Sequence, residues 1–168
     1  MRTDVLAARA VLARSQALLL DFDGPVARVF ADLDRAGLAD ELRTACRDLG
    51  DVLPDQVADT GDPMAALTWS VGHPRPVRLA VDAVVRRHEL LGARRAAPTP
   101  GLDVLLADAR AAGVPVAVVT NNCVQAVGVL VRRAVPALVG VPVAGRVAGR
   151  PEELKPAPVL VRRALEAL

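Results

Sequence analysis

The chain of 168 residues has few aromatic side chains: two phenylalanines, one tryptophan and no tyrosine. Because 52% of the residues are hydrophobic, we expect a substantial core built from alanine, valine and leucine. The formal net charge is only +2, and no basic tract contains aromatic residues that could stack on bases, so the sequence argues against nucleic-acid binding. The length favours one domain with room for a compact insertion.

Cysteine and long apolar runs are also scarce. Cys46 and Cys123 are too far apart for a metal-binding spacing and are expected to be small core residues in a reducing compartment. Asp4, Arg9 and Arg14 interrupt the apolar segment that a signal peptide requires. No apolar run is long enough to cross a membrane. We therefore expect a soluble, cytoplasmic protein without a membrane partner.

Lysine is almost absent, since Lys155 is the only lysine among 21 basic residues. Lysine supplies a compact point charge with three donors, which the planar guanidinium of arginine does not reproduce. Lys155 is therefore a candidate for a specific role. The alternative is an ordinary surface residue.

An apolar run, Ala17–Leu20, ends in two carboxylates, Asp21 and Asp23. This pattern predicts a buried parallel strand that delivers charged groups to its carboxyl end, where open α/β sheets bind ligands. Side-chain alternation places the two carboxylates on one side and Phe22 on the other. Two close carboxylates repel each other unless a cation or a shared proton relieves them. Gly24 permits a sharp turn, and a simple Asp-Gly turn is the alternative interpretation.

A second apolar run, Val116–Val119, ends in Thr120 and Asn121. An acidic pair, then a hydroxyl group, then a lysine is an order typical of a site that handles phosphate. The alternative is that Thr120 or Asn121 caps the helix that follows.

The remaining pattern predicts an α/β protein in which strands and helices alternate. The region between Pro25 and Pro98 has helical spacing and no good strand, and Asp62-Pro63 is a typical helix start. Strand–helix–strand alternation predicts a parallel sheet with right-handed crossovers. We expect strands at 17–22, 116–120 and 141–143, and helices at 4–14, 102–113, 124–133 and from Pro156 onward. A helix stripe from Val77 to Leu91 is expected to end at Gly92.

These residues resemble three motifs of the haloacid dehalogenase-like (HAD) hydrolase superfamily. Asp21–Gly24 resembles its Asp-x-Asp-Gly motif, Thr120 its strand-end Ser or Thr, and Lys155-Pro156 its lysine motif. The resemblance extends from about residue 17 to the C-terminus, and it is greatest to phosphoglycolate phosphatase-like members with a helical cap. Position 25 is proline where the family usually has threonine. The fourth, acidic motif is missing from the sequence, which stops at Leu168, so we expect a core that is truncated at its C-terminus.

The resemblance implies a Rossmann-like parallel sheet, the HAD core, with a helical cap inserted after the first strand. The core would comprise residues 1–24 and 99–168, and the cap residues 25–98. The implied function is a Mg²⁺-dependent phosphatase that acts on a small phosphorylated metabolite through an aspartyl-phosphate. The oligomeric state is left open.

The resemblance also implies roles for individual residues. Asp21 would be the nucleophile, Asp23 the general acid and base, and Lys155 a catalytic cation that balances phosphoryl charge. Asp21 and Asp23 would hold Mg²⁺, because carboxylates and phosphate are its usual partners. The residues expected to bind the substrate are Gly24, Thr120 and Asn121.

Several alternatives stay open at this point. The absent fourth motif favours a truncated or degenerate HAD-fold protein without efficient catalysis. Dehalogenase and phosphomutase activities are further alternatives, although a dehalogenase would not need Asp23. A receiver-like phospho-acceptor also combines aspartates with a threonine and a Lys-Pro pair, but it needs an aspartate at the end of a middle strand.

Overall fold

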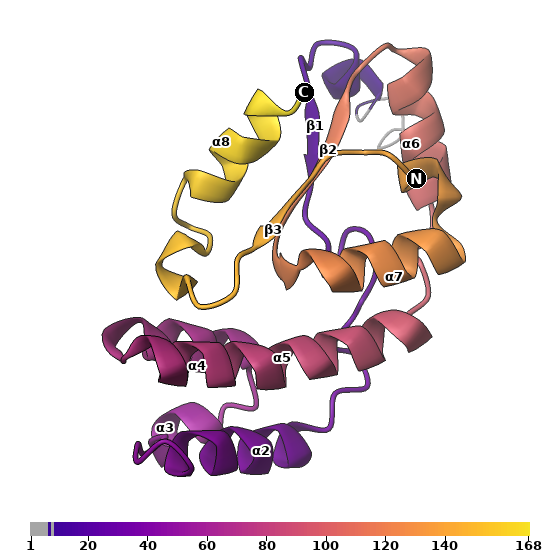
Figure 1. Ribbon diagram of the computed structural model, residues 1–168. Coiled ribbons are helices and arrows are strands. Elements are labelled where there is room, and N and C mark those ends of the chain that lie inside the picture. The colour runs from indigo at the N-terminus through magenta and orange to yellow at the C-terminus, as the bar shows by residue number, and fades with distance from the viewer. Residues whose placement is uncertain (1–6, 8) are drawn as a thin grey trace.

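The computed structural model describes residue 7 and residues 9–168 and contains a three-stranded parallel sheet (Figure 1). Its strands are β1 (Leu18–Leu20), β2 (Val116–Cys123) and β3 (Val143–Arg146), in the order β1-β2-β3. In β1 and β2, Leu18 pairs with Val116 and Leu20 with Val118. The predicted parallel α/β class is therefore confirmed.

The ends of the strands differ from the predictions. Strand β1 is shorter than 17–22, because the carbonyl oxygen of Phe22 accepts turn hydrogen bonds from the N–H groups of Val26 and Ala27 at 3.2 and 3.0 Å. Strand β2 does not stop at residue 120 but continues to Cys123, which pairs with Arg146 after a shift of register. Strand β3 begins at residue 143, two residues later than predicted.

Helices cover both faces of the sheet. Leu20 and Val118 pack with α6 (Leu102–Ala111) and α7 (Val124–Ala134), whereas Ala117 and Val119 pack with α8 (Val159–Glu166). Alternating residues of each strand therefore face opposite helical layers, as expected for a sheet buried on both faces. The predicted helices 102–113 and 124–133 are confirmed, while the last helix begins at Val159 and not at Pro156.

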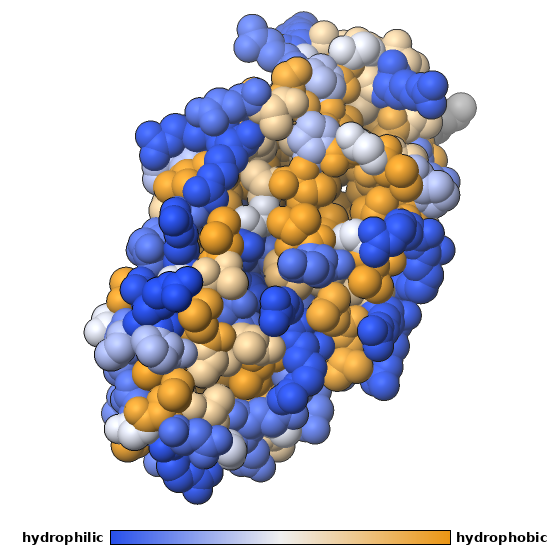
Figure 2. Space-filling view, viewed as in Figure 1, coloured by the Kyte–Doolittle hydropathy of each residue, from blue (hydrophilic) through white to orange (hydrophobic). Residues whose placement is uncertain are grey.

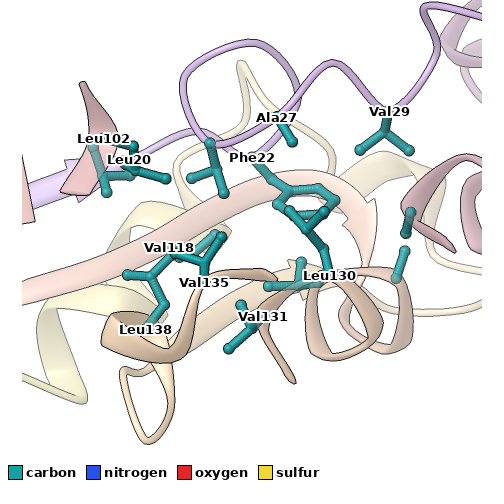
Figure 3. Close-up of a cluster of buried hydrophobic side chains, with 14 of the residues drawn as sticks. Leu20, Phe22, Ala27, Val29, Leu102, Val118, Leu130, Val131, Val135 and Leu138 are labelled. Atoms are coloured by element: carbon teal, nitrogen blue, oxygen red, sulfur yellow. The ribbon is translucent and has the colours of Figure 1, made fainter. Parts of the chain in front are cut away.

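Phe22 lies at the centre of the larger hydrophobic cluster. Its side chain has no exposed surface and points toward Leu130 of α7 (Figure 3). Val26, Ala27 and Val29 bring the segment that follows β1 into the same cluster. The backbone that carries the two aspartates is thus anchored on both sides of each carboxylate.

The region that follows β1 is helical, as predicted, and forms a separate layer below the sheet in Figure 1. Asp62 caps α4 (Pro63–Trp69) by accepting a hydrogen bond from the N–H group of Met64 at 2.9 Å. Helix α5 (Arg75–Arg95) does not end at Gly92 but continues to Arg95. The helices of this layer are α2 (Arg35–Arg47), α3 (Asp55–Ala58), α4 (Pro63–Trp69) and α5 (Arg75–Arg95).

Helix α5 connects two hydrophobic clusters. Val81 and Val85 belong to the cluster of the helical layer, and Ala93 belongs to the cluster beneath the sheet. The proposed division into a core and a cap stays a prediction, with α5 as the element that both parts share.

The remaining elements are short. Three 3₁₀ turns occupy Ser70–Gly72, Pro136–Leu138 and Pro151–Glu153. Residues 9–12 of the helix predicted at 4–14 are helical, and most of its first half lies outside the described residues. None of the described helices is long and apolar enough to cross a membrane. Apolar side chains reach the surface between α8 and the α6–α7 side (Figure 2). The exposed large apolar residues include Val124, Val139 and Val147.

Candidate active site

Asp21 and Asp23 follow β1 at the carboxyl end of the sheet. Their residues are exposed, whereas Phe22 between them is fully buried, so the predicted alternation is present. The side chain of Asp21 is 46% exposed to solvent. A carboxylate that is held on an anchored backbone and open to solvent can reach a ligand without rearrangement of the core.

Lys155 is brought to Asp21 from the C-terminal part of the chain. Its Nζ lies 2.8 Å from Oδ2 of Asp21 and donates a hydrogen bond to the carbonyl oxygen of Val119 at 3.0 Å. The side chain is 26% exposed. This geometry argues against the interpretation of Lys155 as an ordinary surface residue, because its ammonium group is held by Asp21 after β1 and by Val119 within β2.

Asn121 holds the backbone of Lys155. Its Oδ1 accepts a hydrogen bond from the N–H group of Lys155 at 2.7 Å, and its Nδ2 donates to the carbonyl oxygen of Lys155 at 3.2 Å. The helix-cap alternative is wrong, because α7 begins at Val124 with Cys123 at the N-cap and no side-chain cap. Asn121 thus fixes the position of the lysine, and its predicted contact with substrate stays a prediction.

Thr120 is fully buried, and its hydroxyl group makes two hydrogen bonds with Asn122. Its Oγ1 donates to Oδ1 of Asn122 at 2.8 Å and accepts from the N–H group of Asn122 at 3.0 Å. A hydroxyl group has one proton to donate. A bond from Thr120 to a phosphoryl oxygen therefore requires its hydroxyl group to rotate away from Asn122.

Asp23 is held by the segment that follows it. Its Oδ1 accepts a hydrogen bond from the N–H group of Val29 at 2.7 Å. Partial burial of its carboxyl group raises the pKa of Asp23, the N–H groups of Val29 and Phe30 oppose the shift, and the neighbouring charge of Asp21 adds to it. A carboxyl group with a raised pKa is suited to exchange protons nearer neutral pH.

Comparisons with known proteins address the fold. No protein-family model matches the sequence, and no curated protein matches it. The structure is similar to the crystal structure of CbbY from Rhodobacter sphaeroides in complex with phosphate, with a TM-score of 0.54 and 21% sequence identity. The similarity covers 90% of this chain and 71% of that chain.

The fold is HAD-like. This result confirms the fold class that the three motifs implied. At this sequence identity the likeness concerns the fold alone, so the roles of the site residues rest on their geometry.

Gly24 makes a sharp turn directly after Asp23. Its φ is 102°, a conformation that side chains with a Cβ atom rarely adopt. Its N–H group donates to the carbonyl oxygen of Ala27 at 2.9 Å, and its own carbonyl oxygen accepts from Oγ1 of Thr99 at 2.6 Å. The sharp turn expected from the sequence is therefore present, and its contact with substrate stays a prediction.

The residues present fit a magnesium ion that is shared with substrate. Asp21 and Asp23 supply two carboxylates, and the described residues contain no group of three or more His, Cys, Asp or Glu arranged to hold a metal. Magnesium keeps several waters and binds through one or two carboxylates plus substrate phosphates. The donor set thus suits a Mg²⁺–phosphate pair and does not form a closed protein cage.

Sequence reasoning missed a buried polar cluster beside the candidate active site. Asp82 and Glu89 of α5, Asn122 of β2 and Arg146 of β3 are all buried. The signal was present, because Asp82 and Glu89 lie two turns apart on one face of a helix, close to the apolar Val81 and Val85. The partner of these two acids could not be found from the sequence, since Arg146 is one of many arginines.

Proposed function

We propose that this chain is a phosphatase that acts on a small phosphorylated metabolite through an aspartyl-phosphate. The observation that carries the proposal is the solvent-accessible carboxylate of Asp21, held 2.8 Å from the ammonium group of Lys155 with Asp23 beside it. The similar structure of CbbY was solved in complex with phosphate, which supports phosphate as the group that is bound.

In the first step, a carboxylate oxygen of Asp21 attacks phosphorus while the bond from phosphorus to the leaving oxygen breaks. The leaving oxygen takes a proton from the carboxyl group of Asp23 and departs as an alcohol. Lys155 balances the negative charge of Asp21 and of the phosphoryl oxygens. Phosphoryl transfer depends mainly on positioning and charge stabilisation, which these three residues provide.

In the second step, Asp23, now a carboxylate, accepts a proton from a water molecule that attacks the phosphorus of the aspartyl-phosphate. The bond between phosphorus and the Asp21 oxygen breaks, inorganic phosphate leaves, and both aspartates return to their starting states. Asp23 therefore acts first as acid and then as base.

Magnesium would be held by Asp21 and Asp23, together with water and substrate oxygens. When bound, it supplies positive charge that offsets the charge of the phosphoryl group. We further propose that residues 25–98 act as the cap that shapes substrate choice, because this helical region directly follows Gly24.

Two other nucleophile assignments fit less well. A receiver-like acceptor needs an aspartate at the end of a middle strand, but β2 ends at Cys123 and β3 at Arg146. Burial raises the pKa of the Cys123 thiol to about 12, so this residue is not a thiolate near neutral pH.

The direct test is Asp21→Asn, assayed with 4-nitrophenyl phosphate and Mg²⁺. Because an amide cannot act as the nucleophile, we expect kcat to fall by at least about a thousandfold with the fold retained. The matched control is Asp32→Asn, which neutralises an exposed aspartate in the segment after β1 and should leave turnover unchanged. Wild-type turnover in Asp21→Asn would remove the covalent mechanism, and an inactive wild-type chain would favour the degenerate alternative.

A second arm tests Asp23 by the choice of leaving group. Nitrophenolate leaves without protonation, whereas an alkyl alkoxide needs a proton. Asp23→Asn should therefore slow the first step with an alkyl phosphate far more than with the nitrophenyl ester. Release of the leaving group is followed in single turnovers, because hydrolysis of the aspartyl-phosphate is common to both substrates and also needs Asp23. Equal slowing of this release with both substrates would exclude Asp23 as the acid.

A further inference from the structure

Glu89 of α5 accepts hydrogen bonds at every position that a carboxylate offers. Its Oε1 accepts from Nη1 of Arg146 at 2.7 Å and from Nδ2 of Asn122 at 3.1 Å. Its Oε2 accepts from Nη2 of Arg146 at 3.0 Å and from the N–H group of Cys123 at 3.1 Å. The two oxygens of a carboxylate have about four lone-pair sites, so these four donors occupy all the acceptor sites of Glu89.

The cluster lies entirely inside the molecule. The Glu89 and Arg146 side chains are 0% and 1% exposed, and the side chain of Asp82, which accepts from Nε of Arg146 at 2.7 Å, is 5% exposed. Removing charges from water is costly, and such pairs are often no more stabilising than apolar packing. A purely structural account therefore gives little reason for three charged groups at this place.

Two chains of hydrogen bonds connect this cluster with the candidate active site. In the first, Glu89 orients the amide of Asn122, whose Oδ1 accepts the proton of Thr120 at 2.8 Å. In the second, Nη1 of Arg146 donates to the carbonyl oxygen of Asn121 at 2.8 Å, and Asn121 in turn holds the backbone of Lys155. Both chains run through the end of β2.

We propose that Glu89 and Arg146 are positioning residues that fix the backbone of the segment Thr120–Cys123, and through it the ammonium of Lys155. The catalytic part of this inference rests on the proposed phosphatase function. Glu89 belongs to α5, so the helical layer contributes directly to the geometry of the phosphate site at the end of β2.

Asp82 provides a matched control. It belongs to the same helix, is equally buried and pairs with the same arginine, but its one hydrogen bond in the cluster goes to Nε of Arg146 and not to the Thr120–Cys123 segment. Glu89→Gln and Asp82→Asn each remove one buried carboxylate from Arg146. In Asp82→Asn, the amide oxygen can still accept the one hydrogen bond from Arg146. In Glu89→Gln, both carboxylate oxygens were acceptors, so the new NH₂ group must face donors of the segment or of Arg146.

The experiment measures kcat and KM for 4-nitrophenyl phosphate, at a temperature where thermal melts show both variants folded, together with amide hydrogen exchange of the whole chain. For Glu89→Gln we expect kcat to fall about 10- to 100-fold, by analogy with the loss of groups that orient ligand residues. We also expect exchange to accelerate at Asn122 and Cys123. For Asp82→Asn we expect kcat near the wild-type value and unchanged exchange in residues 120–123.

Equal losses of kcat in the two variants, or a normal kcat in Glu89→Gln, would overturn the positioning role. Hydrogen exchange separates this failure from failure of the proposed function. If the wild-type chain has no phosphatase activity, the function fails, while faster exchange confined to residues 120–123 in Glu89→Gln still supports the positioning. Equal exchange in both variants contradicts it.

Asn122→Ala is the second variant if Glu89→Gln does not fold. It removes the amide that joins Glu89 to Thr120 but retains the Arg146–Glu89 pair. We expect faster amide exchange in residues 120–123 of this variant as well, because the link from Glu89 to the segment is lost. Wild-type exchange in folded Asn122→Ala would remove the first of the two hydrogen-bond chains.

Discussion

Lys155 and Asp21 lie far apart in the sequence, yet their charged groups meet at 2.8 Å. The ammonium group also donates to the carbonyl oxygen of Val119, so one small cation satisfies two acceptors, one directly after β1 and one within β2. A guanidinium is larger and planar, and its donors are arranged as a fork. The site therefore depends on the shape of lysine as well as on its charge.

Lys155→Arg is accordingly expected to lower kcat by about a hundredfold, the loss typical of one misplaced charge-stabilising donor. The control is Arg163→Lys, which alters a partly exposed ion pair with Glu153 and should leave turnover unchanged. Steady-state kinetics with 4-nitrophenyl phosphate measure both variants. If Lys155→Arg turned over substrate normally, the charge alone would suffice and the shape argument would be wrong.

At the scale of the elements, α5 approaches the segment after β1 closely at Gly92. A Cβ atom at this position would collide with the carbonyl oxygen of Val29, which is backbone and cannot move aside easily. The sequence suggested that the helix ends at Gly92. Instead, Gly92 lies inside the helix and permits the segment after β1 to pack closely against it. The same segment supplies the N–H group that binds Asp23.

Gly92→Ala should destabilise the protein, because overpacking costs about 1–3 kcal/mol and the gain in helix propensity recovers at most about 1 kcal/mol. Gly128→Ala in α7 is the control, since the nearest atom is the flexible end of Arg132 at 3.1 Å. This control should stabilise the protein by up to about 1 kcal/mol. Urea denaturation with a constant m value measures both, and a Gly92→Ala variant as stable as Gly128→Ala would disprove the close approach.

At the scale of the whole molecule, the helical layer and the sheet are joined by α5. This helix contributes to both hydrophobic clusters and, through Glu89 and Asp82, to the buried ion pairs with Arg146 of β3. Opening the helical layer as a rigid body would break those ion pairs. We therefore expect the two parts to unfold together.

Trp69 permits a direct test, because it is the only tryptophan and packs against the cluster of the helical layer. Its fluorescence reports on that layer, whereas far-UV circular dichroism reports on all helices. Coincident urea midpoints are expected for a single cooperative transition. A fluorescence transition at clearly lower urea would show instead that residues 25–98 unfold as a separate domain.

The sequence alone determined the features that depend on local pattern. Apolar runs that end in polar residues predicted the parallel sheet and the opposite orientations of Phe22 and the two aspartates, because alternation and strand burial are set by neighbouring residues. The cap of α4 at Asp62 followed from the same kind of local rule. The order of the three HAD-like motifs then implied the fold class that the similar structure confirms.

Only the tertiary structure decided which distant groups meet. The sequence could not show that Asn121 holds the backbone of Lys155 or that Thr120 bonds to Asn122. It also could not show that the carboxylate of Glu89 accepts hydrogen bonds from Arg146 and from the end of β2. The strand ends were also misplaced, since pairing between β2 and β3 continues past a shift of register. These features depend on the packing of elements far apart in the chain, and the local periodicity of one segment carries no information about its partner.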